Sequence, residues 1–165
     1  KVWTVPTMGG NFVLDRRFGF SDGVMGGNLW FLGETEDVAI DAAERGAAAV
    51  NDCPGAIMTF PGGVAASASK AGSKYSFLIA STYAEYCPTL RDSPDVKTRL
   101  PENVHSVMEI VINGSSLQVI SDATQAAINA SAETPGLVKI TAGNYGGRLG
   151  KSFVWLKPEL HQATE

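Results

Sequence analysis

Two stretches of this 165-residue chain carry the same pattern at a constant offset of 81 residues, which limits the folds open to it. In each stretch a glycine precedes a segment with helical periodicity, a Pro-Gly pair ends that segment, and a short apolar run follows. The matched residues are Gly33 with Gly114, Val38 with Val119, Ala42 with Ala123, and Pro54-Gly55 with Pro135-Gly136. Strand, helix and strand are therefore expected twice in succession.

Two strand–helix–strand units in tandem predict an α+β fold, a ferredoxin-like βαββαβ sandwich with an antiparallel sheet and additional strands. We expect residues 1–165 to form a single domain of this kind. The helices are predicted at 35–51, capped by Thr35, and at 115–131, capped by Ser115 or Ser116. The strands are predicted at Phe12–Phe20, Asn28–Leu32, Ala56–Phe60, Tyr75–Ala80, Val104–Ile112, Leu137–Thr141 and Phe153–Leu156. A proline-rich irregular excursion is expected between Glu85 and Glu102.

Charge and composition exclude several classes of function. The net charge is −4 with no basic tract, which argues against nucleic-acid binding. No apolar run is long enough to cross a bilayer, and Lys1–Pro6 lack the apolar stretch of a signal peptide, so we expect a cytoplasmic protein. Because these residues read as the start of a strand, we expect the chain to be cut from a longer protein. Cys53 and Cys87 are expected to be reduced thiols, and two isolated histidines predict no metal site.

Two glycine-rich segments follow the two equivalent predicted strands. The first runs from Phe60 to Tyr75, and the second is Ala142–Gly147. Backbone N–H groups in such turns can bind carboxylate, phosphate or carbonyl oxygens, although a flexible surface loop has the same composition. Asn144 and Tyr145 either bind a ligand or serve the turn itself, and Lys70 either neutralises an acidic ligand or lies in solvent.

Glu109 lies within the apolar run Val107–Ile112, and the 81-residue offset pairs it with another polar residue, Asn28. Burial of a carboxyl group disfavours its charged form, so a glutamate in such a strand can hold a proton and act as a general acid. The alternative is a polar position on a half-exposed strand face. The sequence has no defensible Ser-His-Asp order and no Walker loop.

Four blocks of the sequence, spread in order over nearly the whole chain, point to a family. They are Gly26–Thr35, Phe60–Gly72, Glu109–Gly114 and Lys139–Gly150. Together they resemble the C-terminal, or proximal, lobe of formylmethanofuran–tetrahydromethanopterin formyltransferase. The resemblance implies an acyltransferase that moves a formyl group between methanofuran and N5 of tetrahydromethanopterin. It implies these two coenzyme substrates and no prosthetic group.

The resemblance also implies partners and roles for individual residues. Glu109 becomes the catalytic candidate, and an N-terminal lobe and a homo-oligomer, dimer or tetramer, become the expected partners. The expected substrate contacts are Gly62, Gly63, Ser67, Ser69, Lys70, Gly72, Asn144, Tyr145, Gly146 and Gly147. Two other functions stay open: a non-catalytic oligomerisation or pterin-binding module that lacks its partner lobe, and a small-molecule regulatory domain.

Overall fold

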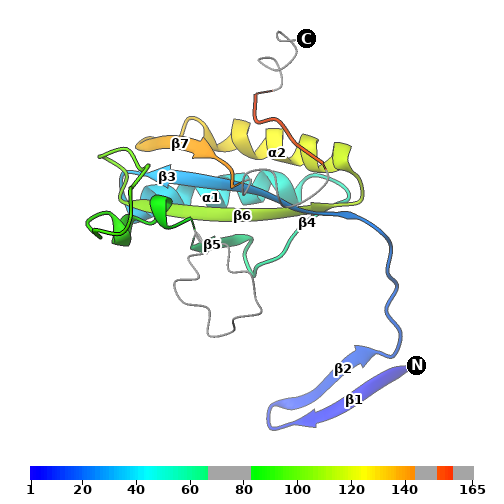
Figure 1. Cartoon of the computed structure of the whole chain (residues 1–165). Helices are drawn as coiled ribbons and strands as arrows, with labels where there is room; N and C mark the ends of the chain where they lie inside the picture. The colour runs from blue at the N-terminus through cyan, green and yellow to red at the C-terminus, as the bar shows by residue number, and fades with distance from the viewer. Residues whose placement is uncertain (67–82, 144–151, 158–165) are drawn as a thin grey trace.

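Two helices cover one face of an antiparallel sheet in the computed structural model, which describes residues 1–66, 83–143 and 152–157 (Figure 1). The helices are α1 (Glu36–Asn51) and α2 (Leu117–Ser131). The strands of the sheet are β3 (Val24–Gly33), β4 (Ala56–Met58), β5 (Val64–Ala66), β6 (Ser106–Gly114) and β7 (Leu137–Thr141). Their order is β4-β6-β3-β7, with β5 also paired to β6, and every pairing is antiparallel. The α+β class is confirmed.

The 81-residue offset reappears in the backbone hydrogen bonds. Thr35 caps α1 by accepting from Val38 N, and Ser116, 81 residues later, caps α2 by accepting from Val119 N. The turns before the helices are tied in a reciprocal way: Glu34 N donates to Gly136 O at 3.1 Å, and Ser115 N donates to Gly55 O at 3.0 Å. Both predicted helices are thus confirmed, together with the turns that flank them.

The offset also determines how the two central strands meet. Leu29 on β3 lies directly opposite Ile110 on β6, and these two residues are themselves repeat equivalents. The local two-fold axis that relates the halves therefore passes through this pair. Asn28 and Glu109, each one residue before the axis, are brought together diagonally on the same face of the sheet.

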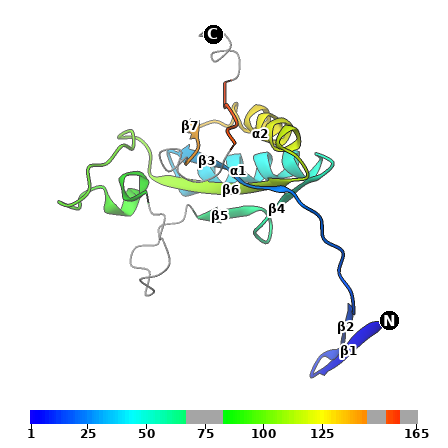
Figure 2. The ribbon, with the colours of Figure 1, turned by 45° about the vertical axis from the view of Figure 1, so that its right-hand side comes forward.

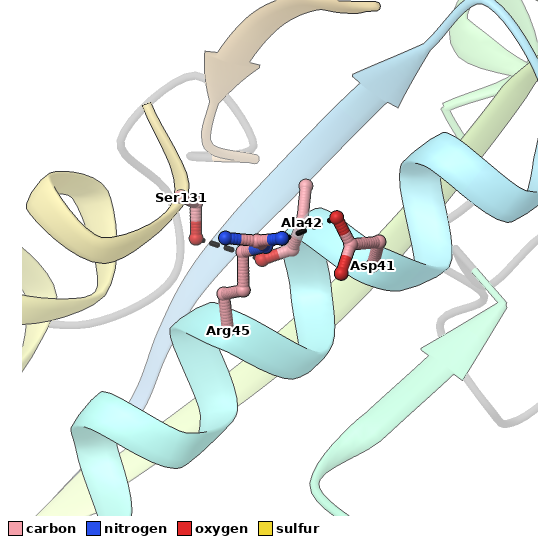
Figure 3. Close-up of polar contacts among 4 residues, drawn as sticks. All are labelled: Asp41, Ala42, Arg45 and Ser131. Carbon is pink, nitrogen blue, oxygen red and sulfur yellow. Dashed lines mark hydrogen bonds and ion pairs between the residues drawn. The ribbon is translucent and has the colours of Figure 1, made fainter. Parts of the chain in front are cut away.

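The main core lies between the sheet and the helices. Leu29, Phe31 and Ile110 are fully buried against small residues of α1 and α2. The helices approach closely because Gly46 has no side chain: a Cβ there would lie 3.0 Å from both Phe31 Cζ and Ser131 Oγ. Ser131 Oγ donates to the carbonyl of Ala42 at 2.7 Å and joins the helices, whereas the Arg45–Asp41 pair is exposed on α1 (Figure 3).

A second apolar cluster lies on the opposite face of the sheet, at one end. Trp30, Leu32 and Val107 project from β3 and β6 and meet Leu100 and Val104 from the excursion before β6. This excursion contains two short 3₁₀ turns, η1 (Ala84–Tyr86) and η2 (Pro88–Leu90), and projects from the end of the sheet (Figure 2). The predicted irregular segment is confirmed.

The first predicted strand is wrong over its second half. A hairpin of β1 (Val2–Thr7) and β2 (Gly10–Asp15) stands away from the main sheet (Figures 1 and 2). β2 stops at Asp15 because its ladder partner there is Val2, the first residue of β1. Phe18 and Phe20 lie beyond it and are exposed, so their apolar character does not mark a strand.

The last predicted strand, Phe153–Leu156, is also wrong. Its alternation is real, because Val154 and Leu156 pack against the main core while the rings of Phe153 and Trp155 stack at 6.3 Å. No ladder hydrogen bonds join the segment to a described strand, so side-chain packing alone produces the pattern. The predicted strand Leu137–Thr141 is confirmed with the same bounds, and those at Asn28–Leu32, Ala56–Phe60 and Val104–Ile112 are confirmed with shifted ends. Tyr75–Ala80 lies outside the described residues.

Candidate functional site

Four strands contribute one residue each to a straight row across the sheet. Strand pairing places Ala65 of β5 beside Glu109, Glu109 beside Trp30, and Trp30 beside Thr141 of β7. Directly paired residues point to the same face, and this face is the one that the helices do not cover. We refer to Ala65, Glu109, Trp30 and Thr141 as the central row.

Glu109 carries an almost buried carboxyl group that two side-chain donors hold at the same oxygen. Its side chain is 8% exposed, and Oε1 accepts two hydrogen bonds, from Asn28 Nδ2 and from Trp30 Nε1, each 3.1 Å long. Oε2 accepts no hydrogen bond from the part of the chain that the structure describes. The carboxyl group is therefore oriented by two N–H donors to Oε1, and among the described residues Oε2 is left for a ligand.

The indole that holds Glu109 is itself fixed by aromatic packing. Trp30 is 3% exposed, and its ring meets Tyr83 edge-on at 5.0 Å and Tyr86 at 5.3 Å between centroids. The ring also meets Gly143, where a Cβ would lie only 2.5 Å from Trp30 Cζ2. The indole N–H consequently has a defined direction, towards the carboxyl group.

Asn28 connects the carboxyl group to the backbone just past β7. Its Oδ1 accepts a hydrogen bond of 3.1 Å from Gly143 N, while its Nδ2 donates to Glu109. Asn28 is half-buried and also lines a hollow of about 150 Å³ with Gly143, Leu117 and Phe153. The amide group thus uses both its polar ends within the protein.

Both glycine-rich segments leave the sheet next to the central row. β5 ends at Ala66, one residue after Ala65, and β7 ends at Thr141, so the chain departs from neighbouring positions on either side of Glu109 and Trp30. β4 and β7 themselves are not adjacent, because β6 and β3 separate them.

The predicted contact residues divide into two groups. Gly62 and Gly63 lie in the turn between β4 and β5, with φ of 72° and 83°, values that other residues rarely adopt. The turn is closed by a hydrogen bond from Gly63 N to Phe60 O at 2.9 Å. The others lie outside the described residues: Ser67, Ser69, Lys70, Gly72, Asn144, Tyr145, Gly146 and Gly147.

Sequence reasoning found Glu109 and its repeat partner Asn28, but it missed three aromatic residues. Trp30 shares the face of Asn28 because the two are separated by two positions in a strand, which is a signal that the sequence carries. Tyr83 and Tyr86 belong to the excursion, and their approach to Trp30 has no counterpart in any local pattern.

Other chemistry is sparse in the parts of the chain that the structure describes. Over these residues, no three His, Cys, Asp or Glu side chains gather as they would around a metal ion. The thiols of Cys53 and Cys87 donate to the carbonyls of Ala49 and Tyr83 within their own turns. None of the described helices is both long enough and apolar enough to pass through a bilayer.

The sequence and the fold were compared with those of known proteins. Residues 10–158 match the family described as "FTR, proximal lobe". The chain belongs to this family.

Curated relatives and solved structures agree with the family assignment. Formylmethanofuran–tetrahydromethanopterin formyltransferases from Archaeoglobus fulgidus and Methanopyrus kandleri are 46% and 45% identical, over 93% and 94% of this chain and 52% and 51% of theirs. The solved enzyme from Methanosarcina barkeri aligns with a TM-score of 0.73 at 41% identity, over 92% of this chain and 51% of its own.

A second solved structure is the formyltransferase/hydrolase complex from Methylorubrum extorquens with methylofuran. It aligns with the same TM-score of 0.73 at 37% identity, over 96% of this chain and 52% of that one. The chain thus spans about half the length of the curated relatives that it matches.

Proposed function

We propose that this chain is the catalytic proximal lobe of an enzyme that transfers a formyl group between formylmethanofuran and N5 of tetrahydromethanopterin. Family membership at 46% identity supports the reaction, and the position of Glu109 supports the location of the chemistry. The two coenzymes are the substrates, and no prosthetic group takes part. The proposed fold is the ferredoxin-like βαββαβ sandwich, for which the strand order β4-β6-β3-β7 is the support.

The reaction requires stabilisation of an oxyanion and the transfer of one proton. N5 attacks the formyl carbon, a C–N bond forms, and the carbonyl oxygen becomes negative. The bond to the methanofuran nitrogen then breaks, N5 loses its proton, and the leaving amine gains one. Donors directed at the developing oxyanion lower this barrier, and the positioning of two large coenzymes supplies much of the rest.

The hydrogen bonds of Glu109 determine which of its oxygens can act on the substrate. Oε1 already accepts from two N–H groups, so Oε2 is the oxygen that carries the proton in the proposed acid role. That proton is donated to the formyl oxygen, or Oε2 takes part in the transfer of the N5 proton. The central row lies between the points at which the two glycine-rich segments leave the sheet. In the proposal these segments contact the coenzymes through Gly62, Gly63 and the residues from Ser67 to Gly72 and Asn144 to Gly147.

The proposal includes an N-terminal lobe as partner, within a cytoplasmic homo-oligomer. In support, the register of the β1–β2 hairpin places Trp3, Val5, Phe12 and Leu14 on one face. Trp3 is 55% and Phe12 59% exposed, and a two-stranded hairpin is marginally stable without packing. An apolar surface of this kind suits a docked lobe or subunit.

The test is the substitution Glu109→Gln, assayed as formyl transfer from formylmethanofuran to tetrahydromethanopterin. Glutamine keeps an oxygen that can accept from Asn28 and Trp30, so the fold persists while the acid is removed. We expect kcat to fall by about 10²- to 10⁴-fold, the usual contribution of a general acid or base. The exposed Glu44→Gln is the matched control and should keep full activity.

The assay is performed on the purified chain alone and with an added N-terminal lobe. Turnover only with the lobe supports the proposal of a catalytic half. Retention of full activity and an unchanged pH profile in Glu109→Gln would remove Glu109 from the mechanism. Pterin binding without turnover in both preparations would instead favour a non-catalytic binding module, the function that the half-length match also permits.

A further inference from the structure

We propose that Asn28 is a positioning residue that sets the orientation of the Glu109 carboxyl group and couples it to the backbone at Gly143. This inference rests on the proposed function, because it concerns the same site. Its observations are the two hydrogen bonds of one amide group: Nδ2 to Glu109 Oε1 and Gly143 N to Oδ1, both 3.1 Å.

The direction of the amide is settled by its neighbours. A backbone N–H can only donate, so the atom of Asn28 that faces Gly143 N must be the oxygen. The nitrogen is then turned towards Glu109, where it can only donate. The carboxyl group therefore meets a donor at Oε1 in whichever protonation state it has, and the donor cannot reverse without breaking the bond to Gly143.

Trp30 supplies the second donor to the same oxygen and restricts the carboxyl group further. Because Oε1 is held from two sides, Oε2 has one position, on the side away from Asn28 and Trp30. If the carboxyl group rotated part-way, the half-buried amide of Asn28 and the buried indole N–H of Trp30 would lose their acceptor. Asn28 thus helps to keep Oε2 as the oxygen that these two donors leave free for the substrate.

Asn28 also links two parts of the site that lie far apart in the sequence. Gly143 lies near the start of the second glycine-rich segment, Ala142–Gly147. It packs against the ring of Trp30, where any larger residue would clash. The amide of Asn28 consequently fixes the distance between the carboxyl group of Glu109 on β6 and the backbone just past the end of β7. A substitution at residue 28 that disturbs only the hydrogen bond to Glu109 should therefore change kcat more than it changes coenzyme binding.

The test uses Asn28→Asp, which keeps an acceptor for Gly143 N but removes the donor to Glu109. Two facing carboxyl groups share a proton, which draws it away from Oε2. In the active form of the enzyme we expect kcat to fall by up to about 100-fold, with KM for both coenzymes within about two-fold of the unmodified enzyme. Asn28→Ala loses both hydrogen bonds, so it should lower kcat and raise KM, and it serves if Asn28→Asp does not fold.

Asn113→Asp is the matched control. Asn113 also accepts a hydrogen bond from a backbone N–H, that of Gly26 at 3.0 Å, and lies four residues from Glu109 on the same strand. The substitution makes the same chemical change without a carboxyl neighbour in contact, so kcat should be unchanged. A comparable loss in both variants would overturn the positioning role.

A double-mutant cycle with Glu109→Gln separates this inference from the proposed function. In the double variant residue 109 has no acid left to position, so Asn28→Asp should lower kcat little further below the level of Glu109→Gln. Additive losses in kcat, or normal kcat in Asn28→Asp beside an inactive Glu109→Gln, overturn the role of Asn28 alone. An active Glu109→Gln overturns the proposed role of Glu109 instead.

Discussion

The two halves of the repeat, β3-α1-β4 and β6-α2-β7, have nearly the same backbone but differ where the chemistry is proposed. Their caps, turns and flanking hydrogen bonds correspond one to one across the 81-residue offset. At the two-fold axis, however, Asn28 of one half corresponds to Glu109 of the other, and Trp30 corresponds to Val111.

This difference shows how a symmetric fold can produce an asymmetric site. Residues next to a two-fold axis meet their own equivalents, so two identical side chains there would face each other as donor to donor or acid to acid. An amide on one strand and an acid on the other form a hydrogen bond instead, at 3.1 Å. The indole of Trp30 then adds a second donor on one side of the axis only.

The largest effect is expected from exchanging the two polar residues across the axis, in the double variant Asn28→Glu/Glu109→Asn. The carboxyl group would then lie on β3 opposite Val111, and Trp30 would lie on its own strand instead of directly opposite it. We expect formyl transfer to fall by at least about 100-fold, as for loss of a positioned acid. Steady-state assays, with circular dichroism to verify folding, measure the effect.

The control for this exchange is Thr35→Ser/Ser116→Thr, which swaps the two helix caps across the same offset. Both residues cap through a side-chain hydroxyl, so activity and stability should be nearly unchanged. Full activity in the Asn28/Glu109 exchange would mean that either strand can present the acid, and the asymmetry would have no catalytic role.

The next largest effect compares two equivalent glycines. A Cβ at Gly33 would lie 2.7 Å from the backbone nitrogen of Ala39, whereas one at Gly114 would lie 2.9 Å from Cγ1 of Ile120, a movable side-chain atom. We therefore expect Gly33→Ala to lower the free energy of unfolding by about 2–3 kcal/mol and Gly114→Ala by about 1 kcal/mol. Urea unfolding of both variants measures the difference, and equal losses would contradict the distinction between backbone and side-chain contacts.

Much of the fold could be predicted because the repeat combines several local signals. A hydroxyl cap at Thr35 and a Pro-Gly stop each indicate a helix boundary weakly, but their recurrence 81 residues later strengthens the prediction of both helices. The strand at Phe12–Phe20 failed because pairing, not apolar content, decides where a strand ends. Phe153–Leu156 failed for a related reason: alternation reports which side chains are buried, and a packed loop can bury every second residue as a strand does.

The candidate site was predictable only where it follows the repeat. Asn28 and Glu109 are linked by the offset, and their contact then follows from the position of the axis. The same register of β3 against β6 places Trp30 opposite Glu109, but the offset gives no reason to expect an indole donor there, because the repeat equivalent of Trp30 is Val111. The aromatic support from Tyr83 comes from an excursion without repeat equivalent, and the role of Lys70 stays a prediction.

A smaller effect is expected at the glycines that end the two Pro-Gly turns. Gly55 and Gly136 are repeat equivalents with φ of 86° and 84°, in the left-handed region where a side chain costs about 1–2 kcal/mol. Gly55→Ala and Gly136→Ala should therefore lower the free energy of unfolding by similar amounts. Thermal and urea denaturation compare the two, and a loss in one variant only would show that the halves carry different strain.

The smallest effect is expected at the helix caps, where the two halves should be indistinguishable. Thr35 Oγ1 and Ser116 Oγ each accept from a backbone N–H three residues later, at 3.2 Å in both cases. Removing either hydroxyl, in Thr35→Ala or Ser116→Ala, should lower the free energy of unfolding by about 1 kcal/mol, and the double variant by about twice as much. Because the cap hydroxyls accept from Val38 N and Val119 N and not from residues of the central row, activity of the folded variants should be unchanged. Any loss of kcat would show that the helix ends and the central row are coupled.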